Sequence, residues 1–191
     1  MIKELAGARV AILAEDLYEE VELWYPYYRL KEAGATVTIV GSGRATMFTG
    51  KHGLPVTADV AIDSVSPSDF DAVVIPGGFA PDLMRRKPAM IEFVHALGTS
   101  GKPVGAICHG GSMLISARLV KDRKLTSFFS IKDDVVAAGA TYVDAEVVRD
   151  GNVITSRVPA DLPAFLPEVI AAIASARSSR VPAGAGSAAA S

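Results

Sequence analysis

The sequence has few of the residues that build disulfide or metal scaffolds. Cys108 is the single cysteine among 191 residues, which excludes an intrachain disulfide and a thiolate zinc site and fits a reducing compartment. The three histidines, His52, His95 and His109, show no metal-ligand spacing. We therefore expect neither a metal nor a cofactor, and Cys108 requires another explanation.

The chain also lacks a charge surplus and a long apolar run. With 19 basic and 21 acidic side chains its formal net charge is -2, so nothing indicates a nucleic-acid site or an anionic membrane partner. No segment reaches the roughly 18 uninterrupted apolar residues that a membrane span needs, and residues 1–5 do not begin a signal peptide. We expect a cytoplasmic protein without membrane contact.

What the chain does have is enough apolar side chains for one core. Half of its residues are hydrophobic, and its length suits one domain. The Ala/Gly/Ser-rich end has no apolar periodicity. We predict a single α/β domain over residues 1–177 and a mobile low-complexity tail over residues 178–191.

Short apolar runs alternate with longer amphipathic segments, a pattern typical of a parallel sheet with helices on both faces. The predicted strands are residues 10–13, 36–40, 72–75, 104–107, 143–148 and 153–155, with alternating character over 56–62, and the predicted helices are 20–33, 88–97, 109–119 and 162–176. Asp150, Gly151 and Asn152 predict a hairpin between the last two strands, near one side of the sheet.

Cys108 lies between the predicted strand 104–107 and the predicted helix 109–119. This is the carboxyl edge of the sheet, where open α/β folds bind ligands. A nucleophile on such a tight turn needs small residues two positions to either side, and Ala106 and Gly110 meet this need. The start of a helix also favours the reactive thiolate. The alternative is that Cys108 is a small buried hydrophobe.

Other chemical groups follow strands at the same edge. Residues 76–78, Pro-Gly-Gly, end a buried strand, and the glycines allow N–H groups to point at an oxyanion. Residues 15–22 are rich in acids, most of them expected to be solvated. One buried carboxyl beside the sulfur would stay protonated and donate a hydrogen bond to it. His109 is adjacent in sequence, which does not show that its imidazole reaches the sulfur.

Six motifs occur in order along the chain. They are VELWYPYYRL (21–30), TGKHG (49–53), IPGGFAPD (75–82), AICHG (106–110), IKDD (131–134) and SRVPADL (156–162). With these motifs the chain resembles, over most of its length, the PfpI-type intracellular proteases of the ThiJ/PfpI superfamily, also named for the DJ-one proteins. The resemblance implies a flavodoxin-like three-layer α/β sandwich, with a mostly parallel sheet, helices on both faces and a nucleophile elbow.

The resemblance also assigns roles by motif position. It implies that Cys108 is the nucleophile and that His109 is its partner. It implies that Asp82 of a neighbouring subunit orients this histidine, and that Glu22 is the inward-facing glutamate of the family. The expected assembly is therefore a homo-oligomer.

Two positions depart from the family pattern. The family has glutamate where this chain has Asp82, which is shorter by one methylene group. The tyrosine that relatives often carry near the cysteine falls on Phe128, which has no hydroxyl. Glu19 lies one turn before the inward glutamate and is a lesser candidate for its place.

These residues favour a stress-response cysteine hydrolase of the peptidase or deglycase kind. In it, Cys108 attacks a carbonyl carbon, and the N–H groups of Gly78 and His109 receive the oxyanion. One alternative is a redox sensor or chaperone-like protein whose thiol oxidises reversibly. Another is a glutathione-independent glyoxalase in which Glu22 moves a proton. The expected substrate is a small molecule, a peptide or a glycated molecule.

Overall fold

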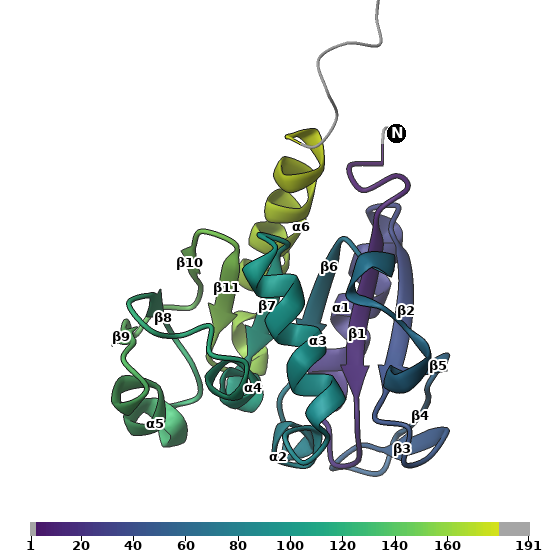
Figure 1. Cartoon of the computed structure of the whole chain (residues 1–191), viewed down its shortest axis with the longest axis horizontal. Coiled ribbons are helices and arrows are strands. Elements are labelled where there is room, and N and C mark those ends of the chain that lie inside the picture. Colours follow the sequence, from purple (N-terminus) through teal and green to yellow (C-terminus); the bar gives the residue numbers. More distant parts are fainter. Residues whose placement is uncertain (1–2, 180–191) are drawn as a thin grey trace, which may run out of the picture.

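The computed structural model describes residues 3–179, which form a central seven-stranded sheet (Figure 1). Its strands are β1 (Arg9–Ala14), β2 (Thr36–Gly41), β5 (Val60–Ala61), β6 (Ala72–Ile75), β7 (Val104–Ile107), β10 (Val148–Asp150) and β11 (Val153–Ser156). They lie in the order β10-β11-β7-β6-β1-β2-β5. Every neighbouring pair is parallel except the β10–β11 hairpin.

Helices cover both faces of this sheet. They are α1 (Glu20–Glu32), α2 (Ala80–Met84), α3 (Pro88–Thr99), α4 (Gly111–Ser116), α5 (Lys132–Ala137) and α6 (Leu162–Ser178). In Figure 1, α3 and α4 lie in front of the sheet, while α1 and α6 pack on each other behind it. The expected three-layer sandwich with a mostly parallel sheet is therefore confirmed.

Shorter elements connect the layers. Two small sheets are formed by β3 (Met47–Thr49) with β4 (Pro55–Thr57) and by β8 (Lys124–Leu125) with β9 (Thr141–Tyr142). The 3₁₀ turns are η1 (Ile62–Ser64), η2 (Pro67–Asp69), η3 (Cys108–Gly110), η4 (Phe129–Ile131) and η5 (Pro159–Asp161). The turn η3 begins with the cysteine directly after β7, and the segment that leads into η4 is bonded to it through the Phe128 N–H and the Cys108 carbonyl.

Among the described residues, one helical stretch, Pro159–Ser178, has the length and composition of a membrane span, with a mean hydropathy of 1.2. Its apolar side is used inside the fold, because α6 packs on β11 and α1. A Cβ at Gly105 of β7 would lie 3.1 Å from Phe165 and Val169 of α6, so helix and sheet are in close contact. This stretch is a core helix of the sandwich.

The helix after the cysteine is shorter than predicted. Instead of one helix over 109–119, the chain makes the 3₁₀ turn η3 and then α4, which ends at Ser116. Arg118 has φ of +58°, which turns the chain back. Leu119 then packs against Gly98 of α3, where an added Cβ would lie 2.4 Å away. Because Leu119 is buried in this contact, the chain leaves the helix after Ser116 and does not form the last predicted turn.

The predicted strand 143–148 is wrong, whereas the hairpin after it is confirmed. Residues 143–145 form a turn, in which the Ala145 N–H donates to the Val143 carbonyl at 3.1 Å. Pairing with β11 begins only at Val148. Gly151 has φ of +59° at the hairpin turn, and β10 is an edge strand as expected.

The predicted tail over residues 178–191 lies outside the described residues from position 180 onward. Ser178 is the last residue of α6, so the helix extends two residues beyond its predicted end.

Candidate active site

Cys108 occupies a tight, strained turn between β7 and α4. It is 8% exposed, and its φ of +59° is in the left-handed region that side chains other than glycine rarely adopt. The backbones around it are in close contact, since a Cβ at Gly110 would lie 2.7 Å from the Ile75 carbonyl oxygen. A Cβ at Gly77 would lie 2.6 Å from the Cys108 Cβ. Small residues are therefore required on both sides of the sulfur.

Two backbone N–H groups face the sulfur, and they are the pair expected from the sequence. The N–H groups of Gly78 and His109 both interact with the Cys108 thiol and act to lower its pKa. Gly78 has φ of +71° and is held by an antiparallel bridge to Tyr18 after β1. In this bridge the Phe79 N–H donates to the Leu17 carbonyl at 2.8 Å. Both donors are thus fixed before any substrate arrives.

Glu22 enters the same site from the first turn of α1 and is completely buried. Its Oε2 accepts a hydrogen bond from the Gly77 N–H at 2.7 Å. Its Oε1 has no hydrogen-bond partner of ordinary geometry among the described residues, and the carboxyl interacts with the neighbouring Cys108 thiol. Burial raises the pKa of Glu22 to about 8. At neutral pH this side chain is mainly a neutral acid that can donate a proton.

Burial opposes the thiolate that the helix start was expected to favour. Burial, followed by repulsion from the Glu22 carboxylate, raises the pKa of Cys108 to about 12. The two backbone N–H groups and a helix start do not offset the loss of water around the sulfur. Because protonation of Glu22 removes the repulsion, thiol and carboxyl titrate as a coupled pair. The raised pKa favours the protonated thiol in the resting site.

The imidazole of His109 reaches the sulfur. Its Nδ1 lies 3.4 Å from Cys108 Sγ, and its Nε2 lies 3.1 Å from Ser130 Oγ. Sequence reasoning did not find Ser130, although it directly precedes the IKDD motif. Only the fold brings η4 beside η3 and so places this hydroxyl at the histidine.

Aromatic rings flank the imidazole of His109. Its centroid lies 4.8 Å from that of Phe128 and 6.2 Å from that of Phe79. Burial, and then the positive charge of Lys51, lower the pKa of His109. The ring is therefore neutral at neutral pH and can act as a base. Phe128 packs on this base where the family tyrosine was expected.

Asp82 and Glu19 do not reach the sulfur or the imidazole within this chain. Asp82 lies on α2, is 66% exposed in its side chain and forms an ion pair with Arg86 one turn later. Glu19 is buried and forms an ion pair with Lys51. Of the two, only Glu19 acts on the site directly, because its negative charge contributes to the raised pKa of Glu22.

One group of possible metal ligands lies beside the site. Ligand atoms of Glu19, Glu20 and His52 are within 4.8 Å of one another. Each carboxylate is already engaged, because Glu20 Oε2 lies 2.8 Å from His52 Nδ1 and Glu19 pairs with Lys51. The arrangement is accounted for by the Glu19–Lys51 ion pair and the Glu20–His52 hydrogen bond.

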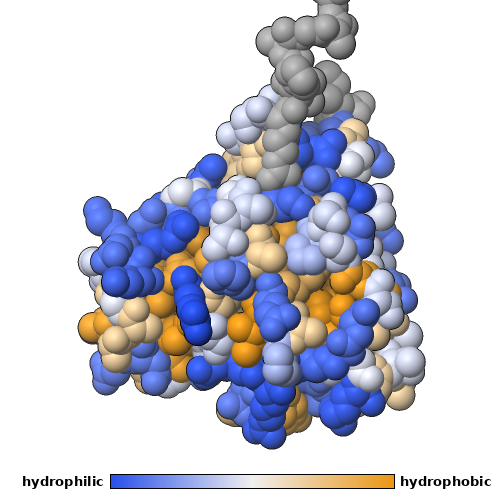
Figure 2. Space-filling view, viewed as in Figure 1, coloured by the Kyte–Doolittle hydropathy of each residue, from blue (hydrophilic) through white to orange (hydrophobic). Residues whose placement is uncertain are grey.

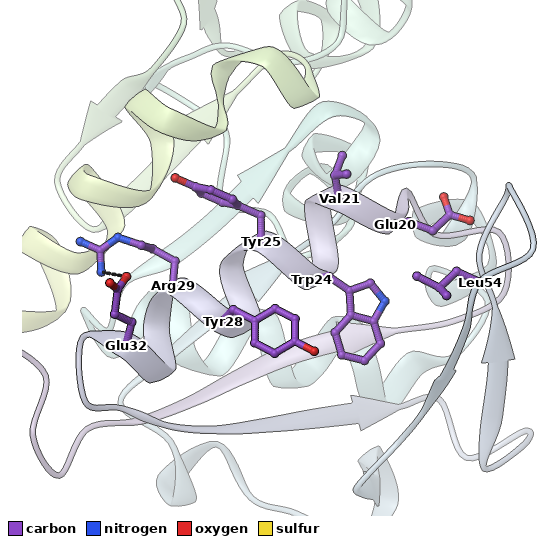
Figure 3. A pocket seen from close by; sticks show the side chains of 8 residues that line it. All are labelled: Glu20, Val21, Trp24, Tyr25, Tyr28, Arg29, Glu32 and Leu54. Carbon is purple, nitrogen blue, oxygen red and sulfur yellow. Dashed lines mark ion pairs between the residues drawn. The ribbon is translucent and has the colours of Figure 1, made fainter.

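Apolar side chains reach the outer surface in more than one area. On the face of α3 and α4, hydrophilic side chains surround smaller apolar areas (Figure 2). Along α1, a cavity of about 710 Å³ is lined mainly by aromatic and aliphatic side chains (Figure 3). Tyr28 is 64% exposed there, and Val21 and Leu54 are about half exposed. This cavity is separate from the site around Cys108, which does not line it.

Comparison with known proteins finds a matching family and similar sequences. Residues 8–172 match the model of the DJ-1/PfpI family. A deglycase of Pyrococcus abyssi is 49% identical over 162 residues, covering 85% of this chain and 97% of that protein. General stress protein 18 of Bacillus subtilis is 42% identical over 167 residues, covering 86% and 97%.

A solved structure is also similar. It is a two-domain protein of Anabaena variabilis with DJ-1/ThiJ/PfpI-like and ferritin-like domains, with a TM-score of 0.84 and 43% identity. The match covers 86% of this chain and 47% of that one. With the family model covering most of its length, this chain belongs to the DJ-1/PfpI family.

Proposed function

We propose that this chain is a stress-linked cysteine hydrolase that removes glycation adducts, with Cys108 as its nucleophile. The observation that carries the proposal is the surroundings of one sulfur atom. Two fixed N–H groups, the acid Glu22 and the base His109 all face it. The names of the Pyrococcus and Bacillus relatives support the deglycase reaction and the link to stress.

The reaction begins with transfer of the thiol proton to His109 Nδ1, 3.4 Å away. For an amine modified by a 2-oxoaldehyde, the sulfur attacks the carbinol carbon and the C–N bond breaks. His109 then gives its proton to the departing amine. The product of this step is the free amine and a hemithioacetal on Cys108.

Glu22 carries the second step. The carbon that bears the hydroxyl group gives a proton to the carboxylate, which returns it to the adjacent former carbonyl carbon, while the hydroxyl proton moves to oxygen. This isomerisation converts the hemithioacetal into a thioester, and a pKa near 8 lets Glu22 both accept and donate at neutral pH. Water then hydrolyses the thioester, and the N–H groups of Gly78 and His109 bind the oxyanion.

The proposal is tested with a peptide whose amines carry methylglyoxal adducts, in a buffer without amines. The expected products are unmodified peptide and lactate, with no turnover by Cys108→Ala. A second reaction uses free methylglyoxal alone at the concentration released by the peptide. If consumption of free methylglyoxal accounts for all loss of adduct, the protein is a glyoxalase and the hydrolase proposal is wrong.

A redox role is a second candidate, favoured by the position of Glu22. Oxidation of Cys108 by a peroxide gives sulfenic acid and water, and the protonated carboxyl would donate a hydrogen bond to the new oxygen. Mass spectrometry after mild peroxide treatment tests this role. Oxidation of Cys108 well before the five methionines supports it, and equal rates exclude it.

We further propose that the chain works in the cytoplasm as a homo-oligomer in which Asp82 of one subunit approaches His109 of another. Two observations support this arrangement. The Asp82 side chain is exposed on α2, and it does not contact the imidazole of its own chain. The exposed aromatic surface along α1 offers a separate area for contact between copies.

A further inference from the structure

We propose that Ser130 is a positioning residue that holds the imidazole of His109 toward Cys108 from within the same subunit. This inference rests on the proposed function of Cys108 as a nucleophile. Its basis is the contact of 3.1 Å between Ser130 Oγ and His109 Nε2, together with the contact of 3.4 Å on the other side of the ring.

The turn that carries Ser130 is tied to the nucleophile itself. The Phe128 N–H donates to the Cys108 carbonyl at 3.3 Å, and the Ile131 N–H donates to the Phe128 carbonyl at 3.2 Å. Ile131 also packs at the start of α4, where a Cβ on Gly111 would lie 3.3 Å from its Cδ1. Backbone and side chain thus fix the position of the serine relative to the sulfur.

The inference requires one tautomer of the imidazole, with the hydrogen on Nε2, and Ser130 Oγ lies where it can accept that hydrogen. A neutral ring has one donor and one acceptor nitrogen. If Nε2 donates to Ser130 Oγ, then Nδ1 is the acceptor and can take the thiol proton of Cys108. Without the serine oxygen, the opposite tautomer would place an N–H against the thiol and would be inactive as a base.

Serine differs from a carboxylate at this place because it is neutral. In the tautomer with the hydrogen on Nε2, its oxygen accepts from Nε2 both before and after His109 is protonated, and it binds the imidazolium more strongly than the neutral ring. Loss of this bond should therefore lower the pKa of His109 further below its usual value. The charged and titratable groups that act on the ring are Lys51, Cys108 and, through the thiol, Glu22.

The Ser130 hydroxyl also complements Asp82, the aspartate that stands where the family has the longer glutamate. In the part of the chain that the structure describes, Ser130 Oγ contacts the imidazole of His109. The hydroxyl hydrogen is therefore available to donate to a carboxylate. Aspartate is shorter than glutamate by one methylene group. If Asp82 of another subunit approaches, the Ser130 hydroxyl can link its carboxylate to the imidazole of His109.

The first test is direct observation of the imidazole by ¹⁵N NMR on the reduced full-length protein. Only three histidines contribute signals, and His109→Gln identifies the relevant one. We expect the Nε2–H tautomer in the native protein and in Ser130→Thr, which keeps the hydroxyl. Ser130→Ala should show a tautomer mixture and a lower pKa of His109. An unchanged tautomer and pKa in Ser130→Ala would overturn the inference.

The second test measures function. Ser130→Ala should lower kcat by about tenfold at unchanged KM, a fraction of the roughly 100-fold or more that a general base contributes. Ser130→Thr should restore most of this loss. The matched control is Ser116→Ala, which removes a serine hydrogen bond to Arg85 away from the site and should leave kcat unchanged. Equal kcat in Ser130→Ala and native protein would contradict the inference.

The two tests separate this inference from the proposed function. The NMR measurement needs no substrate, so it can succeed when no hydrolase activity is found. The rate of Cys108 alkylation by iodoacetamide is a further measurement that needs no substrate. It should fall in Ser130→Ala and not in Ser116→Ala, because proton transfer to His109 precedes alkylation.

Discussion

Cys108 is held in a backbone conformation that is unfavourable for its side chain. Its φ of +59° places it among four described residues other than glycine with positive φ. Such conformations cost about 1–2 kcal/mol and persist where the surrounding structure enforces them. Here the enforcing contacts are the close backbones of Gly77 and Gly110. This conformation places the sulfur near the N–H groups of Gly78 in the neighbouring loop and of His109 in the same turn.

A pair of substitutions measures this strain. Cys108→Gly should be more stable than Cys108→Ala by about 1 kcal/mol, because glycine adopts positive φ without a Cβ clash. Both variants remove the thiol, so the loss of sulfur contacts is largely common to them. Urea unfolding followed by circular dichroism gives the difference. A Cys108→Gly variant that is less stable than Cys108→Ala would show that the turn is not strained.

The buried carboxyl of Glu22 makes stability depend on pH. Its folded pKa of about 8 lies above its ordinary value of 4.5, so between these values the folded state binds more protons than the unfolded state. Stability contributed by the neutral acid is therefore present below pH 4.5 and is lost as the pH rises toward 8.

Glu22→Gln should remove this dependence, because glutamine keeps an acceptor for the Gly77 N–H and does not titrate. In a Cys108→Ala background, the stability difference between the protein with Glu22 and the Glu22→Gln variant should change by about 3 kcal/mol between pH 5 and pH 8, in favour of glutamine at pH 8. Urea unfolding at both values provides the measurement. A constant difference would mean that Glu22 is ionised in the folded protein.

At the residue scale, the sequence predicted the features that depend on where a residue lies relative to the strands. Cys108 at a strand end, and the N–H groups of Gly78 and His109 near it, follow from parallel strands that end at one edge. The protonation state of the sulfur did not follow, because burial depends on the whole fold. Ser130 was missed for the same reason, since its contact joins two turns that are 21 residues apart.

At the scale of elements, the site is a junction between β6, β7 and the turns that follow them. Paired parallel strands bring Ile75 level with Ala106, so both chains leave the sheet together. The loop after β6 supplies Gly78, and the turn after β7 supplies Cys108. This junction leaves no space for a side chain at Gly110, where an added Cβ would meet backbone oxygen.

Two adjacent glycines offer a matched test of this junction. Both have helical φ, near -54° for Gly110 and -55° for Gly111. An added Cβ would lie 2.7 Å from the Ile75 carbonyl at Gly110 but 3.3 Å from side chains at Gly111. Gly110→Ala should cost about 2 kcal/mol or more of unfolding free energy, whereas Gly111→Ala should change it by less than about 1 kcal/mol. Equal effects in thermal or urea unfolding would contradict this packing.

Prediction of elements succeeded where burial on both sides gave a continuous apolar run. The strands 72–75 and 104–107 have the bounds read from the sequence. It failed over residues 143–148, where alternating polar and apolar residues form a turn next to an edge strand. It also missed the short helices α2 and α5, which are too short to show helical periodicity.

At the scale of the whole molecule, the fold gathers segments from four parts of the sequence at one edge. Glu22 follows β1, Gly78 follows β6, Cys108 follows β7, and Ser130 precedes α5. The acid Asp82 is the member of the predicted set that this single chain does not bring to the histidine. In the proposed homo-oligomer, a role of Asp82 at the histidine would depend on a second copy.

Mixing of inactive variants tests the assembly. Asp82→Asn and Cys108→Ala should each be inactive or strongly impaired in isolation. After joint refolding, mixed oligomers should regain up to about a quarter of native activity, because some sites combine an intact cysteine with an intact aspartate from the other chain. Light scattering gives the oligomer size in parallel. If activity does not return in verified mixed oligomers, Asp82 does not act across an interface.

The role of Cys108 as the nucleophile is tested most directly by a single turnover with protein in excess over a peptide that carries methylglyoxal adducts. Rapid acid quenching and mass spectrometry would follow the peptide that contains Cys108, the released amine and lactate. We predict a transient three-carbon adduct on Cys108, the hemithioacetal and then its isomeric thioester, that appears with the free amine and decays as lactate forms. Release of the amine at the same rate by Cys108→Ala, or without any adduct on Cys108, would contradict it.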